Sequence, residues 1–343
     1  MNDTENDSSR RDFVRTAVTA LTLLPFSKVA LTANQDSTAA SPRAAFGPLR
    51  SIDAGDLNVG YVDLGSPTAP AVVLLHGWPY DIHSFAEVAP ALTARGYRVI
   101  VPHLRGFGTT TFRSSQTPRN AQQSVMAVDT IALMDALGIE RAIVAGFDWG
   151  ARTANILAAL WPQRCKAMVS VSGYLIGSPE ANKHPLPPKA EFSWWYQFYF
   201  ATERGREGYA TNRREFADLI WRLASPSWKF DAATFERSAV AFDNPDHVDI
   251  VIHNYRWRLG LATGEARFDA FEATLASAPS IAVPTITLEG DANAAPHPDP
   301  KNYRSKFSGY YEHRTIAGGI GHNLPQEAPK AFVDAIVALD AHA

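Results

Sequence analysis

The strongest constraint on the fold is a repeated alternation of short apolar segments with longer segments of helical character. The apolar segments before residue 175 are residues 71–75, 98–101, 142–145 and 167–171. Each is a predominantly apolar run of strand length, which is typical of strands buried on both faces of a parallel sheet. The helical segments between them are residues 84–95, 125–137 and 151–161. This order predicts a mostly parallel sheet with helices on both faces.

The alternation is interrupted once, in the second half of the chain. Residues 175–277 are rich in aromatic residues, arginine and proline, and they contain no clear strand. The sheet pattern then returns with strand segments 285–288 and 310–316 and a helical segment 326–339. We therefore expect a discontinuous sheet domain, residues 46–174 and 278–343, interrupted by a mostly helical insertion at residues 175–277.

The first 45 residues differ from the rest in composition. Arg10 and Arg11 precede Phe13, and a moderately apolar run follows at residues 17–24. This order resembles a twin-arginine export signal, which predicts a periplasmic or secreted protein. The apolar run is too short to span a bilayer, so no stable membrane insertion is expected. The alternative is a disordered tail with a chance arginine pair, on a protein that stays in the cytoplasm.

The net charge and the cysteine content limit the partners and the cross-links that this chain can have. The formal net charge of −3 gives no reason to expect a nucleic acid. The single cysteine, Cys165, excludes an intrachain disulfide. Because it directly precedes an apolar strand, Cys165 is interpreted as a small buried hydrophobic residue rather than a reactive thiol. The sequence does not indicate an oligomeric state.

A sharp turn links the third apolar strand to the helix that follows it. The segment Gly146-Phe-Asp-Trp-Gly150 has the pattern of a nucleophile elbow, with Asp148 at its apex. The glycines allow a tight turn, and the apex side chain is expected above the carboxyl edge of the sheet, near a helix N-terminus. A carboxylate there can attack saturated carbon and form an ester that water hydrolyses. The alternative is that Asp148 only caps the helix.

Two later residues have the chain order expected for catalytic partners. Asp291 directly follows the strand 285–288, and His322 ends the glycine-rich segment Gly318-Gly-Ile-Gly-His. The order nucleophile, acid, histidine predicts that Asp291 orients His322 and that His322 acts as the base. Glu289 is the nearest alternative for the acid, but it lies inside the strand.

The segment Leu74-Leu-His-Gly-Trp-Pro79 follows the first buried strand. The backbone N–H groups of Trp78 and Trp149 are predicted to form an oxyanion hole. The Trp78–Pro79 bond is a candidate cis peptide. His76 is interpreted as a structural loop residue rather than a base.

These motifs together resemble the α/β-hydrolase superfamily, and within it the branch with an aspartate nucleophile. That branch contains epoxide hydrolases and the haloalkane and haloacid dehalogenases. The motifs that carry the resemblance are HGWP, LRGFG at residues 104–108, GFDWG, Gly290-Asp291 and GGIGH, and the resemblance covers about residues 46–339. It implies an α/β-hydrolase fold whose helical insertion is a lid.

The lid is the part of the sequence that distinguishes epoxide hydrolases from dehalogenases within this branch. Epoxide hydrolases use two lid tyrosines that bind the epoxide oxygen and protonate it as the ring opens. Trp195-Tyr-Gln-Phe-Tyr-Phe200 resembles the segment with the first tyrosine, and His253-Asn-Tyr-Arg-Trp257 resembles that with the second. The resemblance therefore implies roles for Tyr196 and Tyr255. Neutral phenols, with a pKa of about 10, can donate to a basic alkoxide. The alternative is that both are core aromatics.

The expected function is hydrolysis of a small apolar epoxide to a vicinal diol, with water as the second substrate and no cofactor or metal ion. A dehalogenase with the same Asp148, His322 and acid is the nearest alternative. Trp149 suits it as a halide donor, but many epoxide hydrolases also have tryptophan there, so this residue does not discriminate. Arg152 lies where haloacid dehalogenases place a carboxylate-binding arginine. The adjacent arginine of those enzymes is absent, and Arg152 has the alternative of pairing with a carboxylate on its own helix. A non-catalytic ligand-binding protein of the same fold is the third possibility.

Overall fold

The computed structural model describes residues 46–342. Their centre is a nine-stranded sheet with strand order β1-β2-β4-β3-β6-β7-β8-β9, and β5 pairs with β2 beside this path. The strands are β1 (Arg50–Ala54), β2 (Leu57–Leu64), β3 (Ala71–Leu75), β4 (Arg98–Pro102), β5 (Thr111–Phe112), β6 (Ala142–Gly146), β7 (Cys165–Val171), β8 (Thr285–Gly290) and β9 (Tyr311–Ile316). All pairs from β4 through β9 are parallel, whereas β1, β2 and β5 pair antiparallel.

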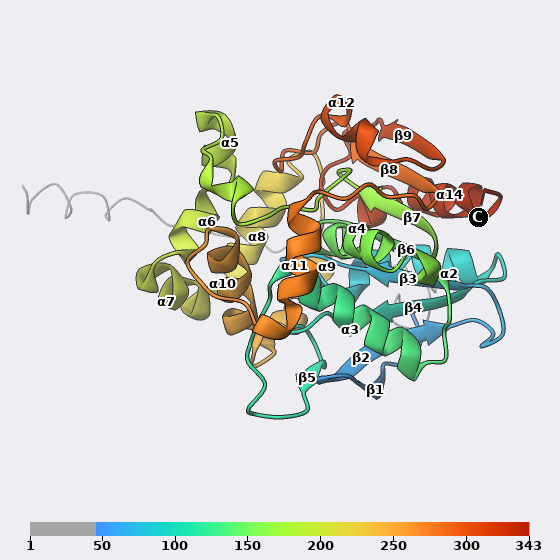
Figure 1. Ribbon diagram of the computed structural model, residues 1–343, viewed down its shortest axis with the longest axis horizontal. Helices are drawn as coiled ribbons and strands as arrows, with labels where there is room; N and C mark the ends of the chain where they lie inside the picture. The colour runs from blue at the N-terminus through green and yellow to red at the C-terminus, as the bar shows by residue number, and fades with distance from the viewer. Residues whose placement is uncertain (1–45, 343) are drawn as a thin grey trace, which may run out of the picture. The chain divides into compact units, whose positions relative to one another are not determined.

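Helices lie on both faces of this sheet (Figure 1). The sheet helices are α2 (Val88–Thr93), α3 (Gln123–Ala136), α4 (Trp149–Leu160) and α14 (Pro329–Asp340). The chain passes from β3 through α2 to one neighbour, β4, and then back through α3 to the other neighbour, β6. Because such crossovers are right-handed, the reversal puts α2 and α3 on opposite faces. Accordingly α3 packs with α4, and α2 packs with α14. The predicted α/β-hydrolase fold is confirmed.

A helical segment separates β7 from β8. Its helices are α5 (Pro188–Ser193), α6 (Trp195–Phe200), α7 (Glu203–Thr211), α8 (Arg213–Ala224), α9 (Ala232–Ala239), α10 (His247–Arg258) and α11 (Asp269–Ala276). Aromatic rings fill the space between them. The Phe200 ring lies 5.0 Å from that of Tyr209, 5.2 Å from that of Phe216 and 5.5 Å from that of Tyr255, measured between centroids. These contacts join α6, α7, α8 and α10 into one aromatic cluster.

The remaining elements connect these layers. They are the short helices α12 (Pro300–Tyr303) and α13 (Leu324–Glu327) and the 3₁₀ turns η2 (Ile82–Phe85), η3 (Pro162–Arg164), η4 (Ala181–Lys183), η5 (Val240–Asp243), η6 (Ala266–Phe268) and η7 (Arg304–Lys306). The segment 84–95, expected as one helix, divides into η2 and α2. Cys165 is buried at the start of β7, and burial raises the pKa of its thiol to about 12, so the thiol is not reactive at neutral pH.

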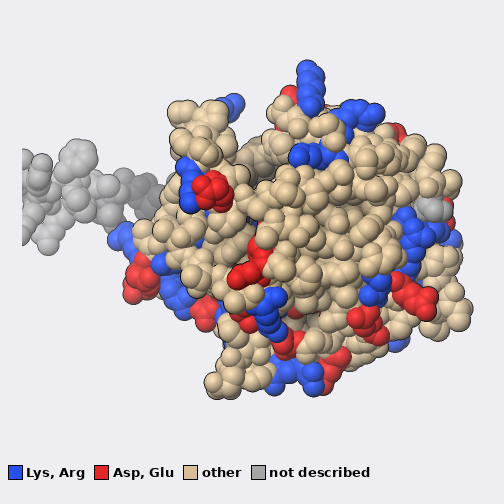
Figure 2. Space-filling model, viewed as in Figure 1, with Lys and Arg blue, Asp and Glu red and all other residues tan. Residues whose placement is uncertain are grey.

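Charged side chains are interspersed on the face of the molecule in Figure 2, where lysines and arginines alternate with acidic residues. No helix within residues 46–342 combines the length and the apolar character that crossing a membrane requires. The export signal predicted for residues 1–45 lies outside the described residues.

Candidate active site

The nucleophile elbow is formed where β6 ends and α4 begins. Asp148 has φ 52° and ψ −123°, a conformation that non-glycine residues seldom adopt. A Cβ atom added to Gly150 would lie 1.9 Å from the carbonyl oxygen of Leu75, so only glycine allows the turn to pack this closely on β3. Asp148 occupies the N-cap position of α4, but its side chain makes no capping hydrogen bond. Helix capping therefore does not account for this carboxylate.

The two carboxylate oxygens of Asp148 have different partners. Oδ1 accepts a hydrogen bond from the backbone N–H of Trp78 at 2.8 Å. Oδ2 lies 3.4 Å from Nε2 of His322. The loop of Trp78 approaches closely because Gly77 has no side chain, since a Cβ atom there would lie 2.3 Å from Cβ of Asp148. The structure thus brings Asp148, His322 and the Trp78 amide together.

Neighbouring groups stabilise the negative charge of the Asp148 carboxylate. Burial acts to raise its pKa, but the hydrogen bond and charge of His322, the Trp78 N–H and the charge of Arg152 outweigh burial, and the pKa lies below its ordinary value. The side chain keeps 22% of its surface exposed. Asp148 is therefore an ionised, accessible carboxylate at neutral pH, as a nucleophile requires.

The predicted oxyanion hole is present in part. The Trp78 N–H already binds Oδ1 of Asp148, and the Trp78–Pro79 bond is cis. The contribution of the Trp149 backbone N–H stays a prediction. The indole Nε1 of Trp149 is buried and has no hydrogen-bond partner within residues 46–342. His76 is buried too, and its Nε2 accepts from the backbone N–H of Leu104 at 3.1 Å, in keeping with a structural role.

Both tyrosines singled out in the sequence pack against the Trp78 ring. Tyr196 in α6 and Tyr255 in α10 each have their ring centroid 5.2 Å from that of Trp78, and their own centroids are 5.3 Å apart. Burial, followed by the negative charge of Asp148, raises the pKa of Tyr196. Burial also raises the pKa of Tyr255, and Tyr196 and Asp148 add to the effect. Both phenols therefore hold their protons at neutral pH.

The prediction that Asp291 orients His322 is wrong in this structure. The exposed carboxylate of Asp291 instead accepts hydrogen bonds from the backbone N–H groups of Gly318, Gly319 and Ile320, at 3.0, 2.9 and 2.9 Å. These bonds lower the pKa of Asp291, with the bond from Gly318 the largest cause. Asp291 thus shapes the glycine-rich turn before His322.

Among the described residues, no carboxylate binds the second nitrogen of the His322 imidazole. Nδ1 of His322 is buried and lacks a hydrogen-bond partner within residues 46–342. Glu289, the alternative acid, is also buried and accepts from Nδ2 of Asn293 at 2.7 Å. Neither acid considered from the sequence makes the expected contact.

Sequence reasoning missed the residues that hold His322 from its backbone side. Oγ of Ser225, just after α8, accepts from the His322 N–H at 2.8 Å and donates to Oε1 of Glu327 at 2.7 Å. Oε2 of Glu327 accepts from the Gly321 N–H at 2.7 Å, and Oε1 accepts from the Asn323 N–H at 3.1 Å. Burial raises the pKa of Glu327. The one available signal was an acidic residue five positions after the histidine.

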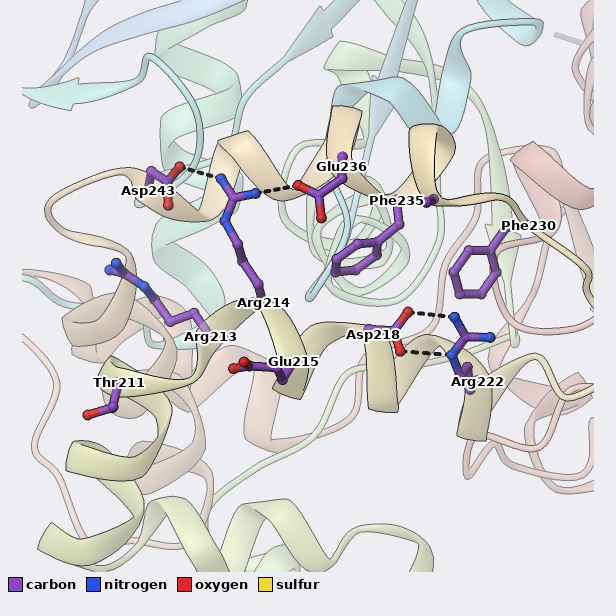
Figure 3. A pocket seen from close by; sticks show the side chains of 11 residues that line it. Thr211, Arg213, Arg214, Glu215, Asp218, Arg222, Phe230, Phe235, Glu236 and Asp243 are labelled. Atoms are coloured by element: carbon purple, nitrogen blue, oxygen red, sulfur yellow. Dashed lines mark hydrogen bonds and ion pairs between the residues drawn. The ribbon is translucent and has the colours of Figure 1, made fainter. Parts of the chain in front are cut away.

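A separate open pocket of about 660 Å³ lies between α8 and α9 (Figure 3). Five of its charged residues are paired with each other: Arg214 with Glu236 and Asp243, and Arg222 with Asp218. It contains none of the residues gathered around Asp148. Within residues 46–342, no cluster of histidine, cysteine or acidic side chains is arranged to hold a metal ion.

Comparison with known proteins agrees with this geometry. The family profile described as "alpha/beta hydrolase fold" matches residues 70–214. The solved structure of a candidate epoxide hydrolase from Klebsiella pneumoniae is 62% identical, with a TM-score of 0.86, and the match covers 87% of this chain and 99% of that one. The chain therefore belongs to the α/β-hydrolase fold family, and it is an epoxide hydrolase-like enzyme.

Two curated relatives match over shorter stretches. Epoxide hydrolase B of Mycobacterium tuberculosis is 36% identical over 148 residues, which cover 40% of this chain and 41% of the relative. A fluoroacetate dehalogenase from a Burkholderia species is 40% identical over 111 residues, which cover 32% of this chain and 35% of the relative. The chain thus spans about two fifths of the length of the first of these relatives and about a third of the second.

Proposed function

We propose that this protein hydrolyses epoxides to vicinal diols through an ester formed on Asp148. The observation that carries the proposal is that the two carboxylate oxygens of Asp148 have different partners. Oδ1 is held by the Trp78 N–H at 2.8 Å, while Oδ2 faces His322 at 3.4 Å. One oxygen is thus already at the position where negative charge develops during ester hydrolysis, and the other is available for attack.

In the first step, Oδ2 of Asp148 attacks a ring carbon, and the carbon–oxygen bond of the epoxide breaks. The electron pair of that bond goes to the leaving oxygen, which takes a proton from Tyr196 or Tyr255. Both phenols are protonated at neutral pH, because burial raises the pKa of each. Their packing on the Trp78 ring supports this role.

In the second step, Nε2 of His322 takes a proton from water as the water oxygen attacks Cγ of the ester. Negative charge then develops on Oδ1, which the Trp78 N–H already contacts, and the Trp149 N–H is the expected second donor. Collapse of this intermediate expels the diol oxygen, which receives the proton from His322. Asp148 is left as a carboxylic acid that carries the second proton of the water. It gives this proton to the tyrosinate formed in the first step, which restores the carboxylate and the phenol, so atoms and charges balance.

Trapping of the ester tests this proposal. In His322→Gln, ring opening proceeds but water activation does not, so an adduct of the epoxide on Asp148 is expected to accumulate. Intact-protein and peptide mass spectrometry would detect it after incubation with styrene oxide. Asp148→Asn is the matched control, which is expected to form no adduct. Absence of an adduct in folded His322→Gln, across a panel of epoxides, would contradict the mechanism.

A dehalogenase is the second candidate, favoured by one observation. The indole Nε1 of Trp149 is buried beside Tyr255, with the two ring centroids 5.9 Å apart, and an indole N–H at this place can donate to a departing halide. The fluoroacetate dehalogenase relative is consistent with this candidate. The double variant Tyr196→Phe/Tyr255→Phe separates the two, because it removes both proton donors needed by an alkoxide and none needed by a halide. Diol formation should fall by about 1,000-fold or more, given the usual contribution of general acids, while halide release should persist if it occurs at all.

A further inference from the structure

Two guanidinium groups flank the tyrosines of the site, and both are partly buried. Arg258, at the end of α10, lies with its Cζ 5.8 Å from the ring centroid of Tyr255 and 5.0 Å from that of Trp194. Arg152, in the first turn of α4, has its Nη1 3.4 Å from Oδ1 of Asn254. One guanidinium thus comes from the sheet domain and one from the insertion.

Neither of these two guanidinium groups has an ion pair with a carboxylate within residues 46–342. The alternative that Arg152 pairs with a carboxylate on its own helix is therefore wrong. Paired arginines are common elsewhere in the chain. Arg105 binds Asp129 at 2.6 Å, and Arg256, in the same helix as Arg258, lies 3.3 Å from Glu203. Arg152 and Arg258 differ from these two arginines in lacking an ion pair, as does Arg237, whose buried Nε has no hydrogen-bond partner within residues 46–342.

The electrostatics of the site agree with an excess of positive charge. Burial lowers the pKa of Arg152 to about 10, and the positive charge of Arg258 adds to this effect, so the two arginines repel one another. Asp148 opposes the shift but supplies only one negative charge. Partly buried like charges are costly unless a counter-charge is present. Two cations and one nucleophilic anion leave one positive charge uncompensated.

Asn254 contributes a further donor without an acceptor. Its side chain is buried, with 1% of its surface exposed, and its Oδ1 accepts the bond from Arg152. Its Nδ2 has no hydrogen-bond partner within residues 46–342. Buried amide donors are rarely left unpaired. Asn254 immediately precedes Tyr255, so the free donor belongs to the same part of the site.

We infer that the substrate is an epoxide that carries a carboxylate, which Arg152 and Arg258 bind while the oxirane ring lies at Asp148. This inference rests on the proposed function and replaces the expectation of a small apolar substrate. The planar guanidinium groups suit a carboxylate, because each can donate two parallel hydrogen bonds to it. The carboxylate also supplies the missing negative charge. A short distance between carboxylate and ring is required, since Tyr255 contacts both Arg258 and Trp78.

A matched pair of substrates tests the inference. Glycidate and glycidamide differ in charge but hardly in shape. The wild-type kcat/KM is expected to favour glycidate by at least about 10-fold, which is the usual strength of a charge-assisted hydrogen bond expressed as a rate ratio. Arg258→Gln should lose about 10- to 100-fold on glycidate, mostly through KM, and change little on glycidamide. Arg152→Gln should act in the same direction.

Arg256→Gln is the matched control, because Arg256 lies on the same helix and is already paired with Glu203. It should change neither rate. A wild-type preference for glycidamide would overturn the inference and leave the proposed function intact. An equal loss on both substrates in Arg258→Gln would also overturn it, because the arginine would then act on the tyrosines rather than on the substrate. If no epoxide forms an Asp148 adduct in His322→Gln, the proposed function itself fails.

Discussion

Oγ of Ser225 accepts a hydrogen bond from the backbone N–H of His322 at 2.8 Å, and so joins the end of α8 to the loop of the expected base. The same hydroxyl donates to Glu327, which also binds the N–H groups of Gly321 and Asn323. His322 is therefore held through its backbone on both sides. No side chain within residues 46–342 orients its imidazole through Nδ1.

Glu327→Gln is expected to slow hydrolysis of the ester more than its formation. Both carboxylate oxygens of Glu327 accept from backbone N–H groups, and a glutamine would turn an NH₂ toward one of these donors. A misplaced base should cost about 10- to 100-fold in the second step, as small displacements of catalytic groups do. Single-turnover mass spectrometry would show the ester accumulating, and Ser225→Ala should behave similarly. Equal losses in both steps would instead indicate general misfolding.

Gly150→Ala is expected to prevent stable folding. The added methyl group would lie 1.9 Å from the Leu75 carbonyl oxygen, which is a backbone atom and cannot rotate away as a side chain could. Overpacking of this kind costs about 3 kcal/mol or more of the free energy of unfolding. Thermal unfolding and soluble yield are the measurements. Gly177→Ala is the control, because an added Cβ there meets no atom within 4 Å, and a comparable loss in that variant would refute the steric explanation.

Asp291→Asn tests the corrected role of Asp291 through its pH dependence. The pKa of Asp291 is lowered in the folded state, so its ionised form stabilises the fold above the unfolded pKa of about 3.9, and this contribution is lost as pH falls through the lower folded pKa. Urea unfolding should show wild type more stable than Asp291→Asn at pH 7, with the difference shrinking below about pH 4.

The same variant also has a kinetic prediction. Loss of an acid that orients a catalytic histidine costs about 10,000-fold in kcat. Because Asp291 binds Gly318, Gly319 and Ile320 and not His322, Asp291→Asn is expected to lose less than about 10-fold, the cost of a loosened turn. Steady-state kinetics with one epoxide would measure this loss in kcat. A loss of several thousand-fold would show that Asp291 is the acid that orients His322.

We propose that residues 1–45 direct twin-arginine export. Replacing Arg10 and Arg11 by lysine should leave the protein in the cytoplasm of a bacterial host that has this pathway, because the arginine pair is the feature its receptor reads. Cell fractionation followed by immunoblotting is the measurement. Arg15→Lys is the matched control and should still be exported. Equal distribution of all three proteins would contradict the proposal.

The parallel core of the fold was predictable because strands buried on both faces carry unbroken apolar runs. β6 and β8 are examples, and both begin where the sequence indicates. The antiparallel strands β1, β2 and β5 were not recognised, because polar residues or glycine interrupt their sequences, RSIDA, LNVGYVDL and TF, and leave no such run. Their positions at and near one edge of the sheet fit this explanation.

The part of the site whose residues are contiguous in sequence was predictable. The elbow residues 146–150 are contiguous, so their spacing alone predicts the turn that holds Asp148. The support of His322 was not predictable, because Ser225 lies 97 residues away in sequence and only the packed structure brings it to the loop. Asp291 was misjudged for a related reason. Its place after β8 suits a catalytic acid, but its carboxylate binds three backbone donors of the glycine turn beside it.

Trp78 has a double connection to the site. Its backbone N–H contacts the oxygen of Asp148 on which charge develops late, whereas its indole ring packs on Tyr196 and Tyr255, which act early. Substitutions at position 78 keep the amide and exchange the ring. A change of the ring therefore acts on ring opening through the two tyrosines, and on the α7 residue Tyr209 that accepts from the indole Nε1, while the amide that serves ester hydrolysis stays in the chain.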